Sequence, residues 1–181
     1  MKYHPIESSL FVRNRQKFMA KMRPSSLAVF NSNDIYPVSA DSTLPFEQHR
    51  DIFYLSGVDQ EESILVLFPD ATDPKHREVL FLRETNEHIA VWEGEKLTKE
   101  RAFSISGIRT VYWLKDFDKV FFDLMTEVDT IYLNTNEHLR AMNVVQTRDL
   151  RFIEWCQKRY PLHKYERLQP IMHALRAVKS E

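Results

Sequence analysis

The sequence is poor in cysteine and glycine, and it carries no excess of charge of one sign. One cysteine among 181 residues excludes an internal disulfide, and three glycines leave no glycine-rich phosphate loop. Cys156 stands beside Trp155 and close to Phe152 and Ile153, so we expect a buried, unreactive thiol. Lys plus Arg is 25 and Asp plus Glu is 26, a balance that counts against nucleic acid as the main partner.

Long apolar runs are also absent. No stretch has the length and hydrophobicity of a bilayer span, and the first residues lack the apolar core of a signal peptide. The apolar fraction of 43% and the charged fraction of 28% are typical of a globular chain. We therefore expect one domain over residues 1–181 in a reducing, cytoplasmic setting, without membrane contact.

The stretch from 39 to 69 is the one around which the rest of the chain is organised. Residues 52–55 form a short aromatic and β-branched run that favours a strand, and Gly57 allows a tight backbone corner after it. Residues 64–68 are continuously apolar, a pattern typical of a strand covered on both faces. The sequence thus predicts two adjacent strands at the centre of a sheet.

The remaining pattern predicts alternating helices and strands. Segments 64–68 and 79–82 are expected to pair as an antiparallel hairpin, and segments 110–113 and 130–133 to be joined by a parallel crossover. The fold class is therefore α/β, with a mixed central β-sheet flanked by helices. Further strands are predicted at 27–30 and, as an extended piece, 89–92; helices are predicted at 8–21, 97–103, 117–125, 139–158 (one helix or two with a kink) and 170–177.

Side chains that could perform chemistry are scattered. The seven histidines show no H-x-x-x-H or H-E-x-x-H spacing, which counts against a metal site of that type. A two-metal nuclease needs several converging acids. Asp41 in S-A-D-S-T reads better as a turn or capping acid, and Asp51 as a capping acid or a partner of Arg50 or Arg13.

Several motifs, taken together, carry a family resemblance. SADS, LPFEQHRD, FYLSG and ILVLFP are followed by VLFLRETNEHIAVWEGEKL and then by PIMHALRAVKSE. In this order, from about residue 11 to residue 181, they resemble the N-terminal domain of aminopeptidase P in the creatinase/prolidase superfamily. The resemblance implies a mixed sheet with flanking helices and a topology akin to ribonuclease H.

The resemblance also implies a function. In that family a C-terminal "pita-bread" domain holds two divalent ions, usually manganese, with two Asp, one His and two Glu, and removes the residue that precedes proline at position 2 of a peptide. No position in this chain matches a metal ligand or a catalytic residue. The resemblance therefore implies a non-catalytic accessory domain of a homo-oligomeric Xaa-Pro aminopeptidase, with the catalytic domain after residue 181.

Two other functional interpretations stay open. The chain could be a stand-alone α/β binding or scaffold module with no peptidase attached. It could also be the corresponding domain of a prolidase, because prolidases share this domain and differ in the length of the substrate. A reading frame that continues past Glu181 with the metal-ligand residues would separate the first alternative from the peptidase.

Trp92 and Asp41 are the substrate-facing candidates. Taken alone, Trp92 in V-W-E-G is more often a core residue than a binding one. In the family, however, the matching tryptophan projects toward a neighbouring subunit's active site, and the position that matches Asp41 lies near the catalytic cleft. Two departures concern subunit contacts, because Glu47 replaces a common basic residue and Ala90 a common acid.

Overall fold

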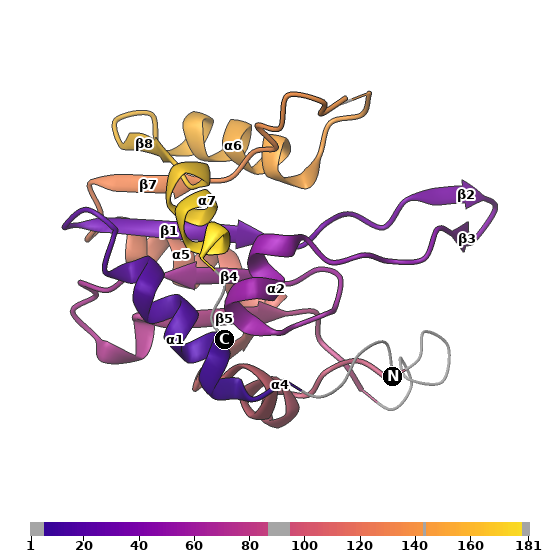
Figure 1. Ribbon diagram of the computed structural model, residues 1–181, viewed down its shortest axis with the longest axis horizontal. Helices are drawn as coiled ribbons and strands as arrows, with labels where there is room; N and C mark the ends of the chain where they lie inside the picture. The colour runs from indigo at the N-terminus through magenta and orange to yellow at the C-terminus, as the bar shows by residue number, and fades with distance from the viewer. Residues whose placement is uncertain (1–5, 87–94, 143, 179–181) are drawn as a thin grey trace.

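A mixed six-stranded sheet forms the centre of the molecule, in the order β6-β5-β4-β1-β7-β8 (Figure 1). The structure is a computed structural model that describes residues 6–86, 95–142 and 144–178. All strands of this sheet run in one direction except β4, which is antiparallel to both of its neighbours. The strands are β1 (Ser26–Asn31), β4 (Ile64–Leu67), β5 (Glu78–Leu82), β6 (Thr110–Trp113), β7 (Thr130–Leu133) and β8 (Lys164–Arg167).

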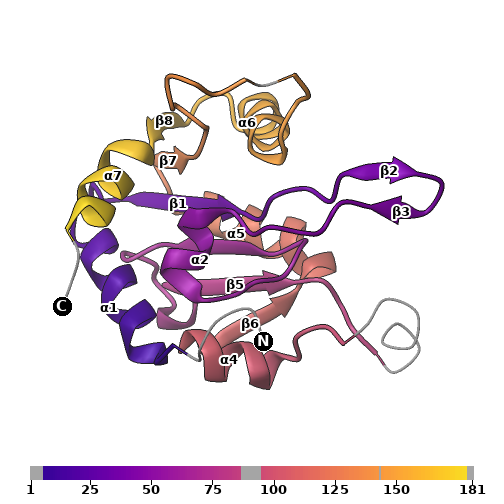
Figure 2. The same ribbon diagram turned by 45° about the vertical axis from the view of Figure 1, so that its right-hand side comes forward.

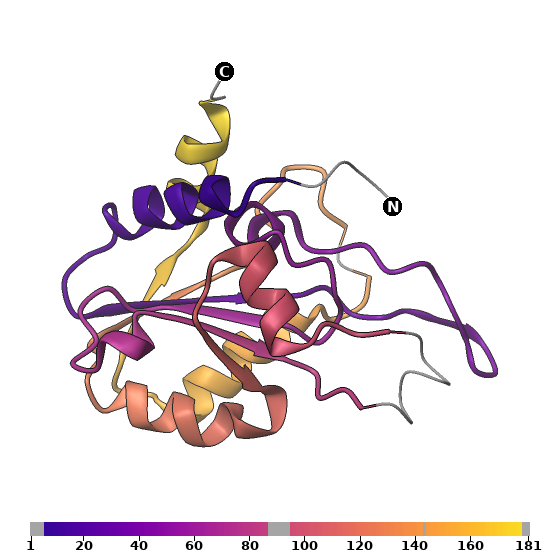
Figure 3. The ribbon, with the colours of Figure 1, turned by 90° about the horizontal axis from the view of Figure 1, so that it is seen from below.

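Helices cover both faces of the sheet. Seen from below, α1 and α7 lie on one side of the strands, and α5 and α6 lie on the other (Figure 3). The first layer consists of α1 (Ser8–Met19), α2 (Arg50–Ser56), α4 (Lys99–Ser106) and α7 (Gln169–Ala177); the second consists of α5 (Phe117–Met125) and α6 (Arg148–Arg159). Two short 3-10 turns, η1 (Pro74–His76) and η2 (Leu114–Asp116), lie between these elements.

The central strands are apolar on both faces because each face meets a helix layer. In β4, Leu65 and Leu67 pack into the core beneath α1, α2, α4 and α7, whereas Ile64 and Val66 pack into the core beneath α5 and α6. All four side chains are buried. This alternation is the period-2 geometry of a strand, and it explains why the run carries no polar residue.

A small hairpin leaves the sheet after β1. It consists of β2 (Pro37–Ser39) and β3 (Ser42–Thr43), which pair antiparallel and project well beyond the body of the domain (Figures 1 and 2). Its tip turns at Ala40, whose φ of 49° lies in the left-handed region. Every residue of both strands is exposed, so the hairpin does not contribute to either core.

The α/β class and most of the predicted elements are confirmed. The strands predicted at 110–113 and 130–133 have the observed bounds, and the predicted antiparallel pairing of 64–68 with 79–82 is that of β4 with β5. The helices predicted at 8–21, 97–103, 117–125 and 170–177 correspond to α1, α4, α5 and α7. The predicted crossover also exists, but three strands separate β6 from β7 in the sheet.

The prediction of a strand at 52–55 is wrong, because these residues form helix α2. Ile52 and Leu55 are fully buried and stand three residues apart, which is helical spacing. The His49 side chain caps the start of the helix, and Gly57, at φ 69°, ends it in a left-handed conformation. Of the expected pair of adjacent central strands, the second exists as β4, and the first is replaced by a helix packed over β1 and β4.

The prediction of a long helix over 139–158 is wrong in its first half. Helix α6 begins only at Arg148, after the N-cap Thr147. Residues 139–142 and 144–147 are not helical, and Leu139, Met142 and Val144 are 100%, 85% and 86% exposed. These apolar side chains are not packed against a core, so their spacing in the sequence does not reflect a buried helix face.

Candidate functional site

Polar residues gather where the parallel strands end. Asn31 and Ser32 close β1, Asn134 follows β7, and the antiparallel β4 is entered from the same edge after Glu61 and Glu62. In open α/β sheets, ligands bind outside the carboxyl ends of the strands. This edge is therefore the place where the fold favours a site.

Reciprocal hydrogen bonds hold the two loops at this edge together. The backbone N–H of Ser32 donates to the Ser63 carbonyl at 2.9 Å, and the N–H of Ser63 donates to Ser32 Oγ at 3.2 Å. The Gln48 side-chain amide donates to the carbonyls of Val58 at 3.1 Å and of Gln60 at 2.9 Å. Because these donors and acceptors are satisfied within the loops, the loops form a fixed wall.

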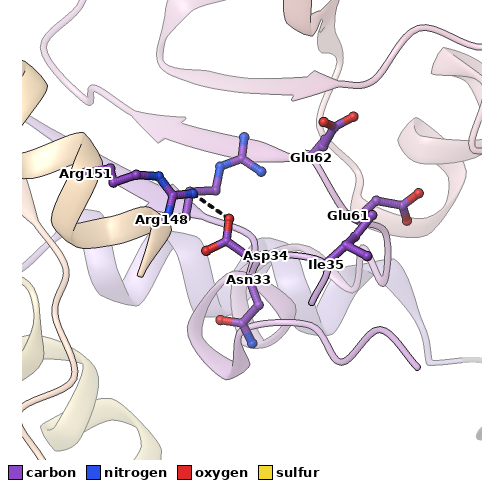
Figure 4. A pocket seen from close by; sticks show the side chains of 7 residues that line it. All are labelled: Asn33, Asp34, Ile35, Glu61, Glu62, Arg148 and Arg151. Carbon is purple, nitrogen blue, oxygen red and sulfur yellow. Dashed lines mark hydrogen bonds and ion pairs between the residues drawn. The ribbon is translucent and has the colours of Figure 1, made fainter. Parts of the chain in front are cut away.

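A pocket of about 340 Å³ lies between these loops and the first turn of α6 (Figure 4). The two arginines of α6 enter from one side, and the two glutamates that precede β4 stand on the other, with Asp34 beside Arg151. The lining residues are Asn33, Asp34, Ile35, Glu61, Glu62, Arg148 and Arg151.

Each carboxylate of the pocket has a cationic partner. Arg151 Nη2 lies 2.6 Å from Asp34 Oδ1, and Arg83 Nε lies 3.2 Å from Glu62 Oε2. Lys96 Nζ pairs with Glu61 Oε1. The acids of the pocket are thus neutralised by the domain itself.

Arg148 is the exception among the charged groups of the pocket. Its Nη1 donates to Ser32 Oγ at 2.8 Å, and within the described parts of the chain no carboxylate lies within 4.0 Å of its guanidinium. Burial lowers the pKa of Arg148, and the more distant carboxylates of Glu62, Asp34 and Asp149 oppose that shift. An arginine remains protonated in proteins, so the pocket holds a partly desolvated cation without an ion-pair partner among the described residues.

A buried carboxylate anchors the last described helix beside this edge. Asp51 is 1% exposed and accepts a hydrogen bond from Arg176 Nη1 of α7 at 2.8 Å. Its other oxygen accepts from Asn134 Nδ2 at 3.2 Å and from Gln169 Nε2 at 3.1 Å. Asp51 therefore ties together α2, the end of β7 and both ends of α7, rather than pairing with Arg13 or Arg50 as the sequence suggested.

A second carboxylate lies between this cluster and the pocket. Asp149 Oδ1 accepts a hydrogen bond from Asn31 Nδ2 at 2.9 Å. Burial raises the pKa of Asp149 to about 6, although the nearby His49 and the bond from Asn31 act in the opposite direction. Asp51 also raises this pKa through like-charge repulsion.

The structure places one of the two substrate-facing candidates. Asp41 lies at the tip of the β2–β3 hairpin, exposed and away from the pocket, in the turn that the sequence indicated. Trp92 lies outside the described residues, as does Ala90. Glu47 is exposed, and its backbone carbonyl accepts a hydrogen bond from Asn33 Nδ2 at 2.9 Å. Asp41 is therefore not among the described residues that line the pocket.

The sequence reading missed the pocket residues Asp34, Arg148 and Arg151. The signal available was T-R-D-L-R, in which a helix-capping threonine precedes two arginines at i and i+3. The expectation of a helix starting at 139 obscured it. As for metals, the described residues hold no group of three or more His, Cys, Asp or Glu side chains that could hold an ion.

The fold and the polar edge define an α/β domain with helices on both faces of a mixed sheet. The family model for the aminopeptidase P N-terminal domain matches residues 11–132, and the chain belongs to that family. The family predicted from the sequence motifs is thereby confirmed.

Curated relatives are Xaa-Pro aminopeptidases that are longer than this chain. That of Escherichia coli is 27% identical over 142 residues, covering 78% of this chain and 32% of the relative. That of Haemophilus influenzae is 24% identical over 170 residues, covering 94% and 37%. The chain thus spans about a third of the length of these relatives.

Solved structures share the fold. Aminopeptidase PepP of Pseudomonas aeruginosa superposes with a TM-score of 0.80 at 24% identity, covering 98% of this chain and 40% of that one. A zinc-substituted aminopeptidase P of E. coli in complex with product has a TM-score of 0.76 at 24% identity, with coverage of 97% and 40%. No helix within the described ranges is long and apolar enough to cross a membrane.

Proposed function

We propose that this chain is the N-terminal accessory domain of a metal-dependent Xaa-Pro aminopeptidase, in which it shapes the substrate cleft and the subunit contacts. One observation carries the proposal. The aminopeptidase of P. aeruginosa superposes on 98% of this chain, whereas the chain covers only 40% of that enzyme. The larger part of such an enzyme lies outside the region that this chain matches. We assign the peptidase chemistry to that larger part, which we place after residue 181.

The acids at the polar edge do not fit a pair of manganese ions. Asp51 is occupied by Arg176, Asn134 and Gln169, and the three acids of the pocket are paired with cations. A two-metal centre needs free carboxylates that converge within a few ångströms. No step of the proposed function is therefore assigned to a metal held by this domain.

Asp41 and Trp92 are the residues that we propose to face the peptide substrate. Asp41 stands at the exposed tip of a hairpin that projects from the domain, and it makes no hydrogen bond or ion pair with another described residue. A carboxylate in that position can reach a neighbouring domain or subunit without disturbing a core. Trp92 is proposed on the family's W-x-G motif alone.

The experiment begins with the coding sequence around this chain. A reading frame that continues past Glu181 with two Asp, one His and two Glu in the ligand pattern supports the peptidase, whereas a stop codon there favours a stand-alone binding module. In the longer protein, Asp41→Asn and Trp92→Ala should each lower kcat/KM for an Xaa-Pro peptide roughly 10-fold or more, because misplaced substrate loses orientation.

The control is Asp123→Asn, which removes an exposed acid from α5, outside the hairpin that carries Asp41. It should leave kcat/KM within a factor of about two, and all three variants should melt like the parent. If Trp92→Ala lowers the melting temperature strongly and activity falls only with the amount of folded protein, Trp92 is a core residue. An Asp41→Asn enzyme with full activity would remove Asp41 from the substrate site.

A further inference from the structure

The pocket beside α6 has one cation more than its own pairings use. Asp34, Glu61 and Glu62 are each neutralised by a neighbouring basic side chain, and Arg151 is consumed in that pairing. Arg148 then remains, with one hydrogen bond to the neutral hydroxyl of Ser32. The unmatched charge in the pocket is therefore positive.

Because Arg148 is partly buried, leaving its positive charge unpaired is unfavourable in free energy. Its side chain is only partly exposed, and its guanidinium is held against the wall by Ser32, whose Oγ is itself fixed by the N–H of Ser63. A partly desolvated ion without a counterion loses hydration that no partner replaces. A bound anion would supply the missing counterion to a guanidinium that Ser32 already holds in place.

The charges around the pocket favour a carboxylate over a phosphate. A guanidinium offers parallel N–H donors that match two oxygens of either group, so the surrounding charges decide between them. The opposite wall carries Glu61 and Glu62, and Asp34 stands beside Arg151 (Figure 4). Even when paired, these acids repel a ligand with two or more negative charges more strongly than a monoanion.

We propose that this pocket binds a single carboxylate group of a peptide, held by Arg148 between the loop after β1, the residues before β4 and the first turn of α6. Its volume of about 340 Å³ lies at the small end of ligand pockets, which suits one or two residues of a peptide. Asp41 is not among the described residues that line this site. The proposed site does not rest on the peptidase assignment, since its test reads binding and not turnover.

The test is a ¹H–¹⁵N NMR titration of the 181-residue chain with N-acetyl-alanine, whose only charge is its carboxylate. Saturable shifts are expected at the backbone amides of Asn33, Asp34 and Glu62 and at the Arg148 Nε–H. N-acetyl-glutamic acid amide carries the same charge on a side chain. Saturation by either compound supports the site and tells a chain-terminal from a side-chain carboxylate; saturation by neither one overturns it.

Variants connect the binding to Arg148. Arg148→Gln should weaken binding at least 10-fold, whereas Arg148→Lys, which keeps the charge but loses the fork, should weaken it less. Arg109→Gln removes an exposed arginine that does not line the pocket and should change the dissociation constant by less than a factor of about two. Equal losses in Arg148→Gln and Arg109→Gln would mean a diffuse charge effect and overturn the proposal.

Two further readouts complete the test. Pyrophosphate should bind more weakly than N-acetyl-alanine, and tighter binding of pyrophosphate at the same amides would overturn the carboxylate assignment. N-acetyl-alanine amide, which is neutral, should produce no saturable shift. The spectrum of Arg148→Gln without ligand shows whether that variant is folded. If it is not, the comparison uses Arg148→Lys and Ser32→Ala; the latter removes the acceptor that orients Arg148. Unchanged affinity in both of these variants would overturn the proposal.

Discussion

At the scale of single residues, a buried arginine holds two helix ends in place. Arg15 of α1 is 0% exposed, and its Nη1 donates to the carbonyls of Leu55 at 2.8 Å and Ser106 at 2.9 Å. These carbonyls lie at the C-termini of α2 and α4, where the helix dipole is negative. Arg15 Nη2 also lies 2.9 Å from Glu78 Oε2, an ion contact without hydrogen-bond alignment, and Arg15 Nε has no acceptor among the described residues.

The first prediction concerns this arginine. Arg15→Met should lower the free energy of unfolding by about 3–5 kcal/mol, because it leaves two buried carbonyls and Glu78 without their cation. Urea unfolding of the isolated chain measures the change. Arg109→Met, at an exposed position, should stay within about 0.5 kcal/mol of the parent. Equal midpoints for Arg15→Met and the parent would show that the helix ends do not depend on Arg15.

The second prediction concerns the pH dependence of stability at Asp149. Its pKa is about 6 in the folded chain, against an ordinary value of 3.8. Between these values the folded chain keeps a proton that the unfolded chain has released, so rising pH from about 4 to 6 should reduce stability. Removing this acid as Asp149→Asn should therefore stabilise the chain at pH 7 by roughly 1–3 kcal/mol relative to its effect at pH 4.

Urea unfolding of Asp149→Asn and the parent at both pH values gives this difference. The asparagine can still accept the hydrogen bond from Asn31, so the comparison isolates the charge. Asp123→Asn, at an exposed position on α5, should show no such difference. If Asp149→Asn shifts stability equally at pH 4 and pH 7, the carboxyl titrates normally and the inferred burial penalty is absent.

At the scale of elements, the periodicity of apolar residues predicted secondary structure well wherever a segment fitted only one pattern, helical or extended. Helix α5 repeats its apolar residues at helical spacing and packs them on one face, and β4 is apolar throughout because it is covered on both sides. The run at 52–55 fits both the helical and the strand pattern. Its strand-like residues become helical because Gly57 supplies a helix C-cap and because the two fully buried members of the run, Ile52 and Leu55, stand at helical spacing.

Other elements carried no usable signal. Strand β8 reads K-Y-E-R and lies at the sheet edge, so it shows no apolar alternation, and the exposed β2–β3 hairpin contacts no core. The pocket depends on Arg148 and Ser32, which are 116 residues apart and meet only because β1 ends and α6 begins at the same edge. Such a pairing cannot be read from spacing along the chain.

The third prediction tests β4 as the centre of the sheet. Leu65→Ala and Leu67→Ala should each lower the free energy of unfolding by about 2–5 kcal/mol, since both side chains are fully buried beneath a helix layer. Val38→Ala, on the exposed hairpin at 59% exposure, should change it by less than about 0.5 kcal/mol. Denaturant midpoints that do not separate the two leucine variants from Val38→Ala would make β4 a peripheral strand.

At the scale of the whole molecule, stability and proposed function occupy different places. Two cores, one on each face of the sheet, contain nearly all the large buried side chains. The projecting hairpin with Asp41 and the pocket with Arg148 stand at one edge, where few apolar contacts depend on them. Substitutions at this edge should therefore change binding with little change in folding, and substitutions in the cores should do the reverse.

The last prediction concerns what the domain does alone. The isolated 181-residue chain should not hydrolyse an Xaa-Pro peptide and should not bind manganese tightly, because the acids of its polar edge are engaged with arginine, lysine and amide groups. Releasing one of these carboxylates for a metal would break its ion pair or hydrogen bond and leave the partner group unpaired. Calorimetry with manganese and a proline-peptide assay, with an active Xaa-Pro aminopeptidase as the positive control, measure both properties. A stoichiometric, micromolar isotherm, or turnover by the purified chain, would place metal chemistry within this domain and contradict its accessory role.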